Sequence, residues 1–382
     1  MDKIRVAILF GGRSGEHQVS LASARSVMGA LDPERYEIYP VGIDPSGRWI
    51  ADGDPLTLLE QGQSHVPALG ERAENQAAES DVPELPAKQG GALVHGPLIP
   101  GPASTRFPQV DVVIPVLHGT YGEDGTVQGL LELADVAYVG ADVLGSAIGM
   151  DKVVQKAVLK AYGLPVVKYV AVLRARWQAA PEEVLDEIEG LLPYPMFTKP
   201  ANAGSSVGVA KAHDRAELAR GLALAARFDR KLLIEEGVDA REIECSVLGN
   251  DDPIASVAGE VRPASEFYDY SAKYLDGTSE LDIPAHLTQE QMQEVQQLAI
   301  RAFQAIDCAG MARVDFFLER GTGRWYVNEL NTIPGFTAIS MYPKLWEASG
   351  LPYPKLLDRL VELALERKAD KRRSQTTYDF DH

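Results

Sequence analysis

Two short stretches near the C-terminal end of the chain carry residues that could hold a divalent cation. The stretches ARVDFFLE at 312–319 and RWYVNELN at 324–331 are rich in β-branched and aromatic residues. Between them, Gly321, Thr322 and Gly323 are typical of a short hairpin loop. The pattern therefore predicts two paired antiparallel strands.

The register of this hairpin decides which side chains face each other. If the loop is centred on Thr322, Asp315 lies opposite Glu329. The same register places Arg313 opposite Asn331, and the two-residue period of strands puts all four side chains on one face. Two carboxylates and an amide oxygen could then hold Mg²⁺, with phosphate oxygens and water completing the ligand shell. From these strands alone, a solvated face with cross-strand charge pairs is an equally good interpretation.

The composition limits the class of protein. The 382 residues are 45% hydrophobic and 24% charged, as in an ordinary globular protein, and a chain of this length predicts two or three domains. The net charge of −18 argues against a sequence-independent nucleic-acid partner, because such binding needs a broad basic surface. Any anionic ligand must therefore be held by a few local lysines.

The cysteines and apolar runs indicate the compartment. Cys245 and Cys308 show no CxxC or zinc-type spacing, so neither a disulfide framework nor a cysteine metal site is predicted. The N-terminal run KIRVAILF is too short for a signal peptide, and no stretch approaches the ~18 apolar residues of a membrane helix. The sequence therefore predicts a cytoplasmic protein with no membrane partner.

The order of apolar runs and helical patterns predicts three regions of mixed α/β and α+β structure. Residues 1–140 indicate an N-terminal α/β domain with a parallel sheet, interrupted at about 60–108 by a Pro-, Gly-, Ala- and Gln-rich insertion. Residues 141–239 and 240–370 indicate two α+β lobes.

The last region also carries two distinctive segments. Residues 261–285 are polar and aromatic. Residues 371–382 form a tail, and the chain is expected to fray from Lys368 on. Across the chain, strands are predicted at 4–10, 36–43, 110–117, 195–199, 209–212, 231–236, 241–249 and 253–260, and helices at 19–31, 126–134, 151–162, 214–228, 288–306 and near 340–367.

A glycine loop could approach phosphate groups. The sequence GSSVG at 204–208 joins two predicted strands, and its small residues let backbone N–H groups come close to phosphate oxygens. Lys199, at the end of the preceding strand, could neutralise a phosphate. Lys152, at a helix start, could be a second such lysine. Locally, a plain flexible turn and an exposed helix lysine are the simpler interpretations.

The first loop could be confused with a dinucleotide fingerprint. It follows a strand and opens a helix, but its pattern is GGxxG, and the acid Asp44 lies about thirty residues on rather than the expected ~20. A nicotinamide cofactor is therefore disfavoured. Glu16 at the helix start could be a simple dipole partner. His118 follows a strand at its carboxyl end, which is the usual ligand side of a parallel sheet.

Taken in order, these segments resemble one known family. The chain is similar to the D-alanine:D-alanine ligases of the ATP-grasp superfamily. The matching stretches cover most of the chain outside 60–108 and the tail: FGGRSGEHQVSL, LHGTYGEDGTVQG, SAIGMDK, TKPANAGSSVGV, LIEEGVDAREIECSV, FYDYSAKY, GMARVDFFL and NELNTIPGFTAIS. The resemblance implies an ATP-grasp fold, in which two α+β lobes sandwich the nucleotide.

The resemblance also implies an ATP site with Mg²⁺ ions. Asp315, Glu329 and Asn331 would ligate two Mg²⁺ ions, for which Mn²⁺ could substitute. The residues implied at the nucleotide are Lys152, Lys199, Ser206 and Lys273 at the phosphates, Glu235 and the backbone near Val238 at the adenine, and Glu242 at the ribose, with Phe317 and Asn328 as further nucleotide-binding residues.

The remaining implied residues would bind two D-alanine molecules. Glu16, Ser205 and Tyr274 would lie near the amino group of the first D-alanine, with His118 close by. Arg313, the Gly335 backbone and Ser340 would hold the carboxylate of the second D-alanine and the developing oxyanion. The segment 261–285 would be a lid over both substrates.

The resemblance further implies the product and the assembly. Relatives that accept D-lactate lack the tyrosine-containing lid pattern, so the intact FYDYSAKY favours an amine nucleophile and a dipeptide product for peptidoglycan synthesis. A homodimer is expected. Two alternatives stay open: an ATP-grasp carboxylate–amine ligase with another acceptor, and a nucleotide-sensing or NAD-binding module without ligase activity.

Overall fold

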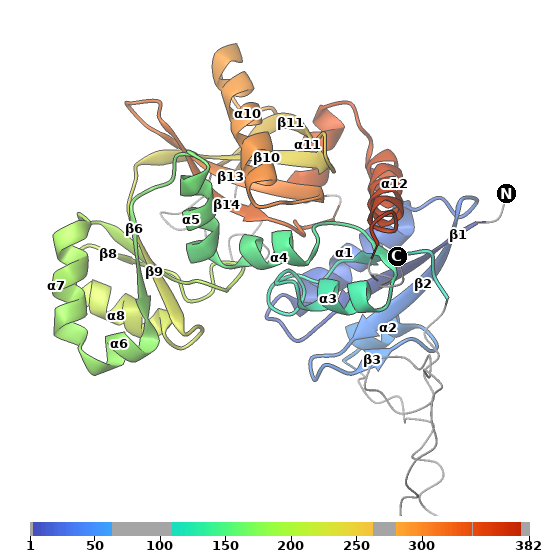
Figure 1. Ribbon diagram of the computed structural model, residues 1–382, viewed down its shortest axis with the longest axis horizontal. Coiled ribbons are helices and arrows are strands. Elements are labelled where there is room, and N and C mark those ends of the chain that lie inside the picture. The colour runs from blue at the N-terminus through green and yellow to red at the C-terminus, as the bar shows by residue number, and fades with distance from the viewer. Residues whose placement is uncertain (1–2, 63–108, 263–279, 338, 376–382) are drawn as a thin grey trace, which may run out of the picture.

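The computed structural model describes residues 3–62, 109–262, 280–337 and 339–375. Three sheets account for their strands, one within each of the three regions predicted from the sequence, and Figure 1 shows them in three separate parts of the molecule, each with helices packed against it. No helix among these residues has the length and apolarity required to cross a membrane. The predicted insertion at 60–108, most of the lid and the end of the tail lie outside the described residues.

The N-terminal sheet has the strand order β3-β2-β1-β4-β5. Its first strands form the expected βαβ unit, in which β1 pairs in parallel with both β2 and β4, and β3 is an antiparallel edge. The elements of this part are β1 (Ile4–Gly11), α1 (His17–Ala30), β2 (Tyr36–Ile43), β3 (Trp49–Ile50), α2 (Pro55–Glu60), β4 (Val112–Pro115), α3 (Thr126–Leu133), β5 (Ala137–Tyr138) and α4 (Val143–Met150). The carboxyl ends of β1 and β4 bring the loops that carry Glu16 and His118 to one edge.

The second sheet has the order β6-β9-β7-β8 and is antiparallel between all neighbours. Helices α6, α7 and α8 lie against it in Figure 1. The elements are α5 (Lys152–Ala161), β6 (Tyr169–Leu173), α6 (Arg174–Ala179), α7 (Pro181–Leu191), β7 (Met196–Pro200), β8 (Ala210–Ala212), α8 (Arg215–Ala225) and β9 (Lys231–Glu236). Asp151 caps α5 by accepting from the amides of Val153 and Val154 at 3.1 Å, and this places Lys152 in the first helical turn.

The third sheet has the order β12-β11-β10-β13-β14. Its outer face is covered by α10, which begins with a capping box between Thr288 and Gln291. The elements are β10 (Ala240–Gly249), β11 (Ile254–Arg262), β12 (Glu280–Asp282), α10 (Gln289–Ala305), β13 (Gly310–Glu319), β14 (Trp325–Asn331), α11 (Met341–Ala348) and α12 (Tyr353–Lys371).

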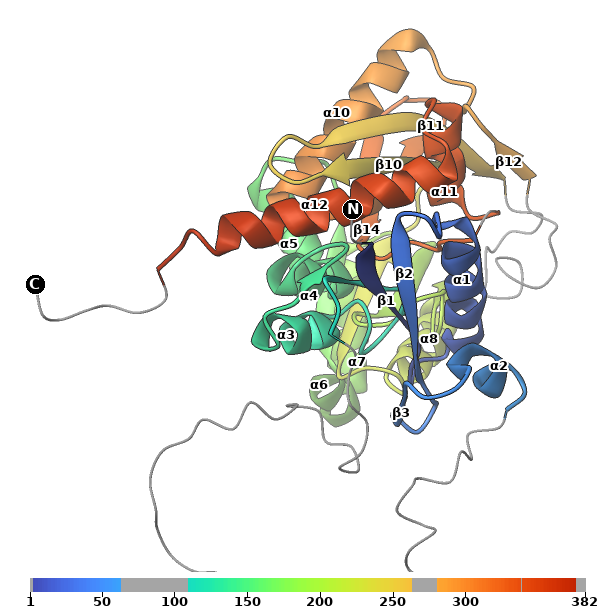
Figure 2. The ribbon, with the colours of Figure 1, turned by 90° about the vertical axis from the view of Figure 1, so that its right-hand side faces the viewer.

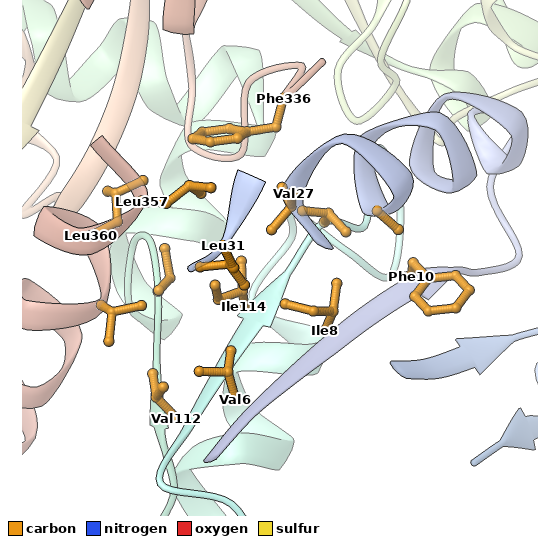
Figure 3. Packing of buried hydrophobic residues seen from close by; sticks show 14 of the residues in the cluster. Val6, Ile8, Phe10, Val27, Leu31, Val112, Ile114, Phe336, Leu357 and Leu360 are labelled. Atoms are coloured by element: carbon orange, nitrogen blue, oxygen red, sulfur yellow. The ribbon is translucent and has the colours of Figure 1, made fainter. Parts of the chain in front are cut away.

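The C-terminal helix α12 returns to the N-terminal sheet. Its buried leucines join β1, α1 and β4 in one apolar core, together with Phe336 from the loop after β14, as Figure 3 shows for Leu357 and Leu360. Figure 2 shows α12 running between β10 and β11 on one side and β1 and β2 on the other. Because α12 and Phe336 anchor the loop after β14 to the first sheet, the third sheet is positioned against the first.

The expectation that the chain frays from Lys368 on is wrong. Helix α12 continues to Lys371, and its last turn is held by the loop around β5. Lys368 forms an ion pair with Asp135, and Lys371 lies 2.5 Å from Glu132. Arg367 donates to the carbonyl of Tyr138 at 2.8 Å. These charged side chains have partners on α3, on the turn after it and on β5, so they extend the helix instead of ending it.

Candidate active site

A single cleft of about 1310 Å³ collects most of the residues singled out from the sequence. It lies where loops of all three sheets meet, and it is large enough for a nucleotide together with small substrates. Its lining contains every described candidate except Asp315, namely Glu16, His118, Lys152, Lys199, Ser205, Ser206, Glu235, Val238, Glu242, Arg313, Phe317, Asn328, Glu329, Asn331, Gly335 and Ser340. Lys273 and Tyr274 lie outside the described residues.

The hairpin has the register predicted from the sequence. Asp315 pairs with Glu329 and Arg313 pairs with Asn331, and a bulge follows Asp315. The Arg313 guanidinium donates twice to the Asp315 carboxylate, each time at 2.7 Å, and the Asn331 amide nitrogen donates to the same carboxylate at 2.9 Å. Asp315 is therefore covered by its neighbours on the hairpin, which explains why it does not line the cleft.

The acids of the hairpin are balanced by cations from the protein. Lys152 lies 3.3 Å from Glu329, and its ammonium also donates to the Ala203 carbonyl at 2.9 Å. Arg313 contacts Glu244 of β10 at 2.9 Å as well as Asp315. Within the described residues no group of three or more His, Cys, Asp or Glu could hold a metal ion without help. A metal at this hairpin would therefore need ligand oxygens from a substrate, as Mg²⁺ commonly does.

Two lysines and a glutamate form a second charged group at the cleft, of which Lys199 and Glu235 line the wall and Lys156 lies behind it. The Glu235 carboxylate lies 2.5 Å from the Lys199 ammonium and 2.6 Å from the Lys156 ammonium. Burial alone would raise the pKa of Glu235, but the two lysines outweigh burial and lower that pKa to about 2. Burial opposes ionisation of Lys199, yet Glu235 and Glu329 raise the Lys199 pKa, so Lys199 stays charged.

Glu16 and Ser205 meet across the cleft from two different sheets. Ser205 Oγ donates to the Glu16 carboxylate, whose side chain is buried at the start of α1. Ser205 and Ser206 have φ angles of 48° and 58°, in the left-handed region that non-glycine residues rarely adopt. Such strain concentrates at functional sites, because the surrounding structure must hold it in place.

Two glycines make room for the Glu16 carboxylate. A Cβ atom on Gly204 would lie 2.6 Å from Glu16 Oε2, and a Cβ atom on Gly119 would lie equally close to it. Real Cβ atoms do not come so near, so both positions require glycine while Glu16 keeps this place. The loop after β7 and the loop after β4 are therefore shaped around one carboxylate.

His118 links the first sheet to the loop after β14. It is 4% exposed, and its Nδ1 lies 3.1 Å from the Ile333 carbonyl oxygen. Because a carbonyl only accepts, Nδ1 carries the proton, and Nε2 accepts from Ser23 Oγ at 3.1 Å. Burial lowers the pKa of His118, which favours this neutral ring. The geometry makes His118 a holder of the loop that carries Gly335 and Ser340.

Gly335 and Ser340 also lie together. Ser340 Oγ accepts from the Thr337 amide at 3.0 Å, and a Cβ atom on Gly335 would lie 3.0 Å from the same oxygen. This places the serine hydroxyl against the Gly335 backbone at the cleft surface. The side chain and the backbone could then donate to one bound carboxylate.

Glu123 lies in the LHGTYGEDG loop and is a site residue that the sequence did not predict. Its carboxylate accepts from the Gly119 amide at 2.7 Å and from the Ile333 amide at 3.2 Å, so it joins the same two loops as His118. Burial, with a further contribution from Glu16, raises the pKa of Glu123 to about 8. The position of Glu123 in the loop after the carboxyl end of β4 is the sequence feature that could have identified it as a site residue.

A pH effect follows from the raised pKa of Glu123. Between pH 4.5 and pH 8 the folded protein keeps a proton on Glu123 that the unfolded chain has lost, so this group's contribution to stability falls as pH rises through that window. Glu123→Gln removes this titration. We expect the loss of stability between pH 5 and pH 8, measured as a denaturant midpoint, to be smaller in Glu123→Gln than in the wild type; an equal or steeper loss would contradict the assignment.

Lys156 and Glu244 were also missed by sequence reasoning. Lys156 lies four residues after Lys152 on the same face of a helix, and Glu244 lies two residues after Glu242 on the same face of a strand. Glu244 pairs with Asp315, so the carboxylates of Glu244, Asp315 and Glu329 form one row across three strands. Periodicity could have identified both residues.

The comparisons with known proteins agree over the whole chain. The family model described as D-ala D-ala ligase N-terminus matches residues 5–141, and the model described as D-ala D-ala ligase C-terminus matches residues 158–362. A D-alanine–D-alanine ligase of Thermoanaerobacter sp. (strain X514) is 52% identical, covering 97% of this chain and 99% of its own.

Solved structures give the same result. The D-alanine-D-alanine ligase from Coxiella burnetii is 36% identical with a TM-score of 0.77, covering 98% of this chain and 97% of its own. The VanG D-Ala:D-Ser ligase from Enterococcus faecalis is 34% identical with a TM-score of 0.78, covering 95% of this chain and 100% of its own.

The three sheets around one charged cleft define an ATP-grasp fold, which these structural neighbours share. The fold and the relatives that share it place this chain in the class of ligases. More narrowly, the chain belongs to the D-alanine–D-alanine ligase family, since the two family models together match most of its residues.

Proposed function

We propose that this protein uses ATP to join two D-alanine molecules into D-alanyl-D-alanine for peptidoglycan synthesis. The observation that carries the proposal is the convergence of three groups on one cleft: the acids of the β13–β14 hairpin, the lysine group around Glu235, and the Glu16–Ser205 pair. Together these groups draw on all three regions of the chain, and a binding module without catalysis would not need all three groups.

The chemistry requires activation of a carboxylate. A carboxylate is a poor electrophile, so transfer of the ATP γ-phosphoryl group to the first D-alanine forms an acyl phosphate and releases ADP. Lys199 and Lys152 would hold the phosphates, since both lysines line the cleft. Glu16 and Ser205 would hold the amino group of the first D-alanine at the opposite wall.

The second step joins the two amino acids. The amine of the second D-alanine attacks the acyl carbon, and phosphate leaves. Arg313, the Gly335 backbone and Ser340 would hold the second carboxylate and the oxyanion that develops during attack. A guanidinium suits this task because it stays charged and its donors are fixed in a fork.

The hairpin fits a Mg²⁺ site. Asp315 and Glu329 offer carboxylate oxygens and Asn331 offers an amide oxygen, which are the ligands that Mg²⁺ accepts beside phosphate oxygens. Such ions would supply positive charge to the phosphates of ATP. Arg313 contacts Asp315 and Lys152 contacts Glu329, so the acids of the hairpin also have cationic partners from the protein.

A glycine substitution tests the first-substrate site. In Gly204→Ala the new Cβ would push the Glu16 carboxylate away from Ser205. We expect KM for the first D-alanine to rise by about tenfold or more, because a shift of ~1 Å in positioning groups can cost up to ~10². Binding of ATP, measured by calorimetry, should change little. The matched control is Gly190→Ala, a helical glycine with open space around it; equal kinetics in the two variants would contradict the role of Glu16.

Product identity tests the proposal directly. The protein is incubated with ATP, Mg²⁺ and an equal mixture of D-alanine, D-serine and D-lactate, and the products are identified by mass spectrometry. We expect D-alanyl-D-alanine as the main product, with phosphate release that needs ATP, Mg²⁺ and D-alanine together. A predominance of D-alanyl-D-serine would favour the reaction named for the Enterococcus faecalis neighbour. Phosphate release regardless of the amino acid would favour a different acceptor.

We also propose a homodimer that acts in the cytoplasm, as the family resemblance implies. Light scattering coupled to size-exclusion chromatography tests the assembly: a mass of twice 41.5 kDa is expected, and a monomer at micromolar concentration would contradict it.

A further inference from the structure

Lys156 is a buried lysine behind the wall of the cleft. Its side chain is 1% exposed, and it does not line the cleft, although Glu235, Lys199 and Asn328 around it do. It lies on α5, one turn after Lys152. A lysine is rarely buried so completely unless its charge is used.

The Lys156 ammonium joins elements of two sheets. It lies 2.6 Å from Glu235 on β9 of the second sheet and donates to the Asn328 carbonyl on β14 of the third sheet at 3.1 Å. Both strands supply residues to the cleft. Burial lowers the pKa of Lys156, and the Glu235 carboxylate opposes that decrease.

The charges of this group sum to an excess of one. Lys156 and Lys199 are two cations, and the Glu235 carboxylate between them is one anion. Glu329 and Glu242 also raise the pKa of Lys199, but they are not counted in this group of three side chains. If Lys199 alone faced Glu235, the pair would be neutral. With Lys156 present, Glu235 is balanced from behind, and the group presents a net positive charge to the cleft through Lys199, which is 15% exposed.

We propose that Lys156 is a positioning residue that balances Glu235 from outside the cleft and so leaves the charge of Lys199 for the phosphates of the nucleotide. The inference rests on the proposed function, because it assumes that ATP binds in this cleft. Lys156 would then affect ATP binding without touching the nucleotide, because its side chain does not line the cleft.

The test compares ATP with adenosine, since only ATP carries the phosphates. Dissociation constants are measured by calorimetry in the presence of Mg²⁺ and without D-alanine. In Lys156→Met we expect the preference for ATP over adenosine to fall by roughly tenfold. Without Lys156, the Glu235 carboxylate neutralises the charge of Lys199 near the phosphates. The control Lys160→Met removes an exposed lysine from the same helix and should leave this preference unchanged.

A double variant separates charge balance from structural support. Lys156→Met with Glu235→Gln removes one cation and one anion, so Lys199 again carries the excess charge. We expect the preference for ATP over adenosine to return close to that of the wild type, even if the single variant is too unstable to measure. A preference that stays about tenfold reduced in the double variant would overturn the inference, and so would an unchanged preference in a folded Lys156→Met.

The two proposals fail in different ways. If the wild type does not bind ATP, the proposed function fails. If the wild type binds ATP and Lys156→Met keeps its preference for ATP over adenosine, only the role of Lys156 is wrong.

Discussion

Glu329→Gln should abolish turnover while leaving the fold intact. The substitution removes one negative charge from the acids of the hairpin at nearly constant volume, and Glu329 lines the cleft beside Lys152. We expect kcat to fall by roughly 10³-fold or more, since lost electrostatic stabilisation at a charged transition state has effects of this order. Steady-state phosphate release and the thermal midpoint are the measurements.

A second readout for Glu329→Gln does not depend on turnover. The Mg²⁺ dependence of ATP binding, measured by calorimetry, should weaken in the variant. Glu319→Gln is the matched control, because Glu319 ends strand β13 and lies outside the cleft lining. Near-normal activity of Glu329→Gln at saturating Mg²⁺ would show that the hairpin does not hold the metal.

Arg313→Lys should separate the two chemical steps. A lysine keeps the charge but loses the fork that now donates twice to Asp315 and contacts Glu244. We expect dipeptide formation to fall by roughly 10²- to 10³-fold, as for loss of an oxyanion donor. Formation of the acyl phosphate should be much less affected, and hydroxylamine can trap it as D-alanyl hydroxamate.

The control for Arg313→Lys is Arg324→Lys, at the exposed end of the same hairpin. Its dipeptide formation should stay at the wild-type level. If Arg313→Lys lowered hydroxamate and dipeptide equally, Arg313 would act in the first step or in folding, and its assignment to the second substrate would be wrong.

The part of the fold that sequence reasoning predicted is the part that local patterns determine. The Gly-Thr-Gly loop and the two-residue alternation were sufficient to pair Asp315 with Glu329, because the register of a hairpin follows from its loop. Continuous apolar runs likewise predicted β1 and β4, which pair in parallel and are almost entirely buried.

The parts that were missed depend on contacts between distant segments. Helix α12 looked like a closing helix of the third region, but its leucines complete the core of the first sheet more than 300 residues away in sequence. The pairing of Lys156 with Glu235 joins a helix to a strand of the second sheet. Helical spacing indicates which residues share a face, whereas the partner of that face is decided by the tertiary fold.

The roles of single residues were predicted mainly through the family resemblance. Local sequence presented Lys152 as an exposed helix lysine, and the structure places it against Glu329 and the Ala203 carbonyl. The functions given to Lys273 and Tyr274 stay predictions, since both residues lie outside the described parts of the chain.

The most direct test follows oxygen atoms through the reaction. D-alanine labelled with ¹⁸O in both carboxylate oxygens is supplied with ATP and Mg²⁺, and the released phosphate is analysed by mass spectrometry. If the carboxylate attacks the γ-phosphorus to form an acyl phosphate, each dipeptide formed moves one ¹⁸O atom from D-alanine into phosphate. Dipeptide formation with unlabelled phosphate would contradict an acyl phosphate in this cleft.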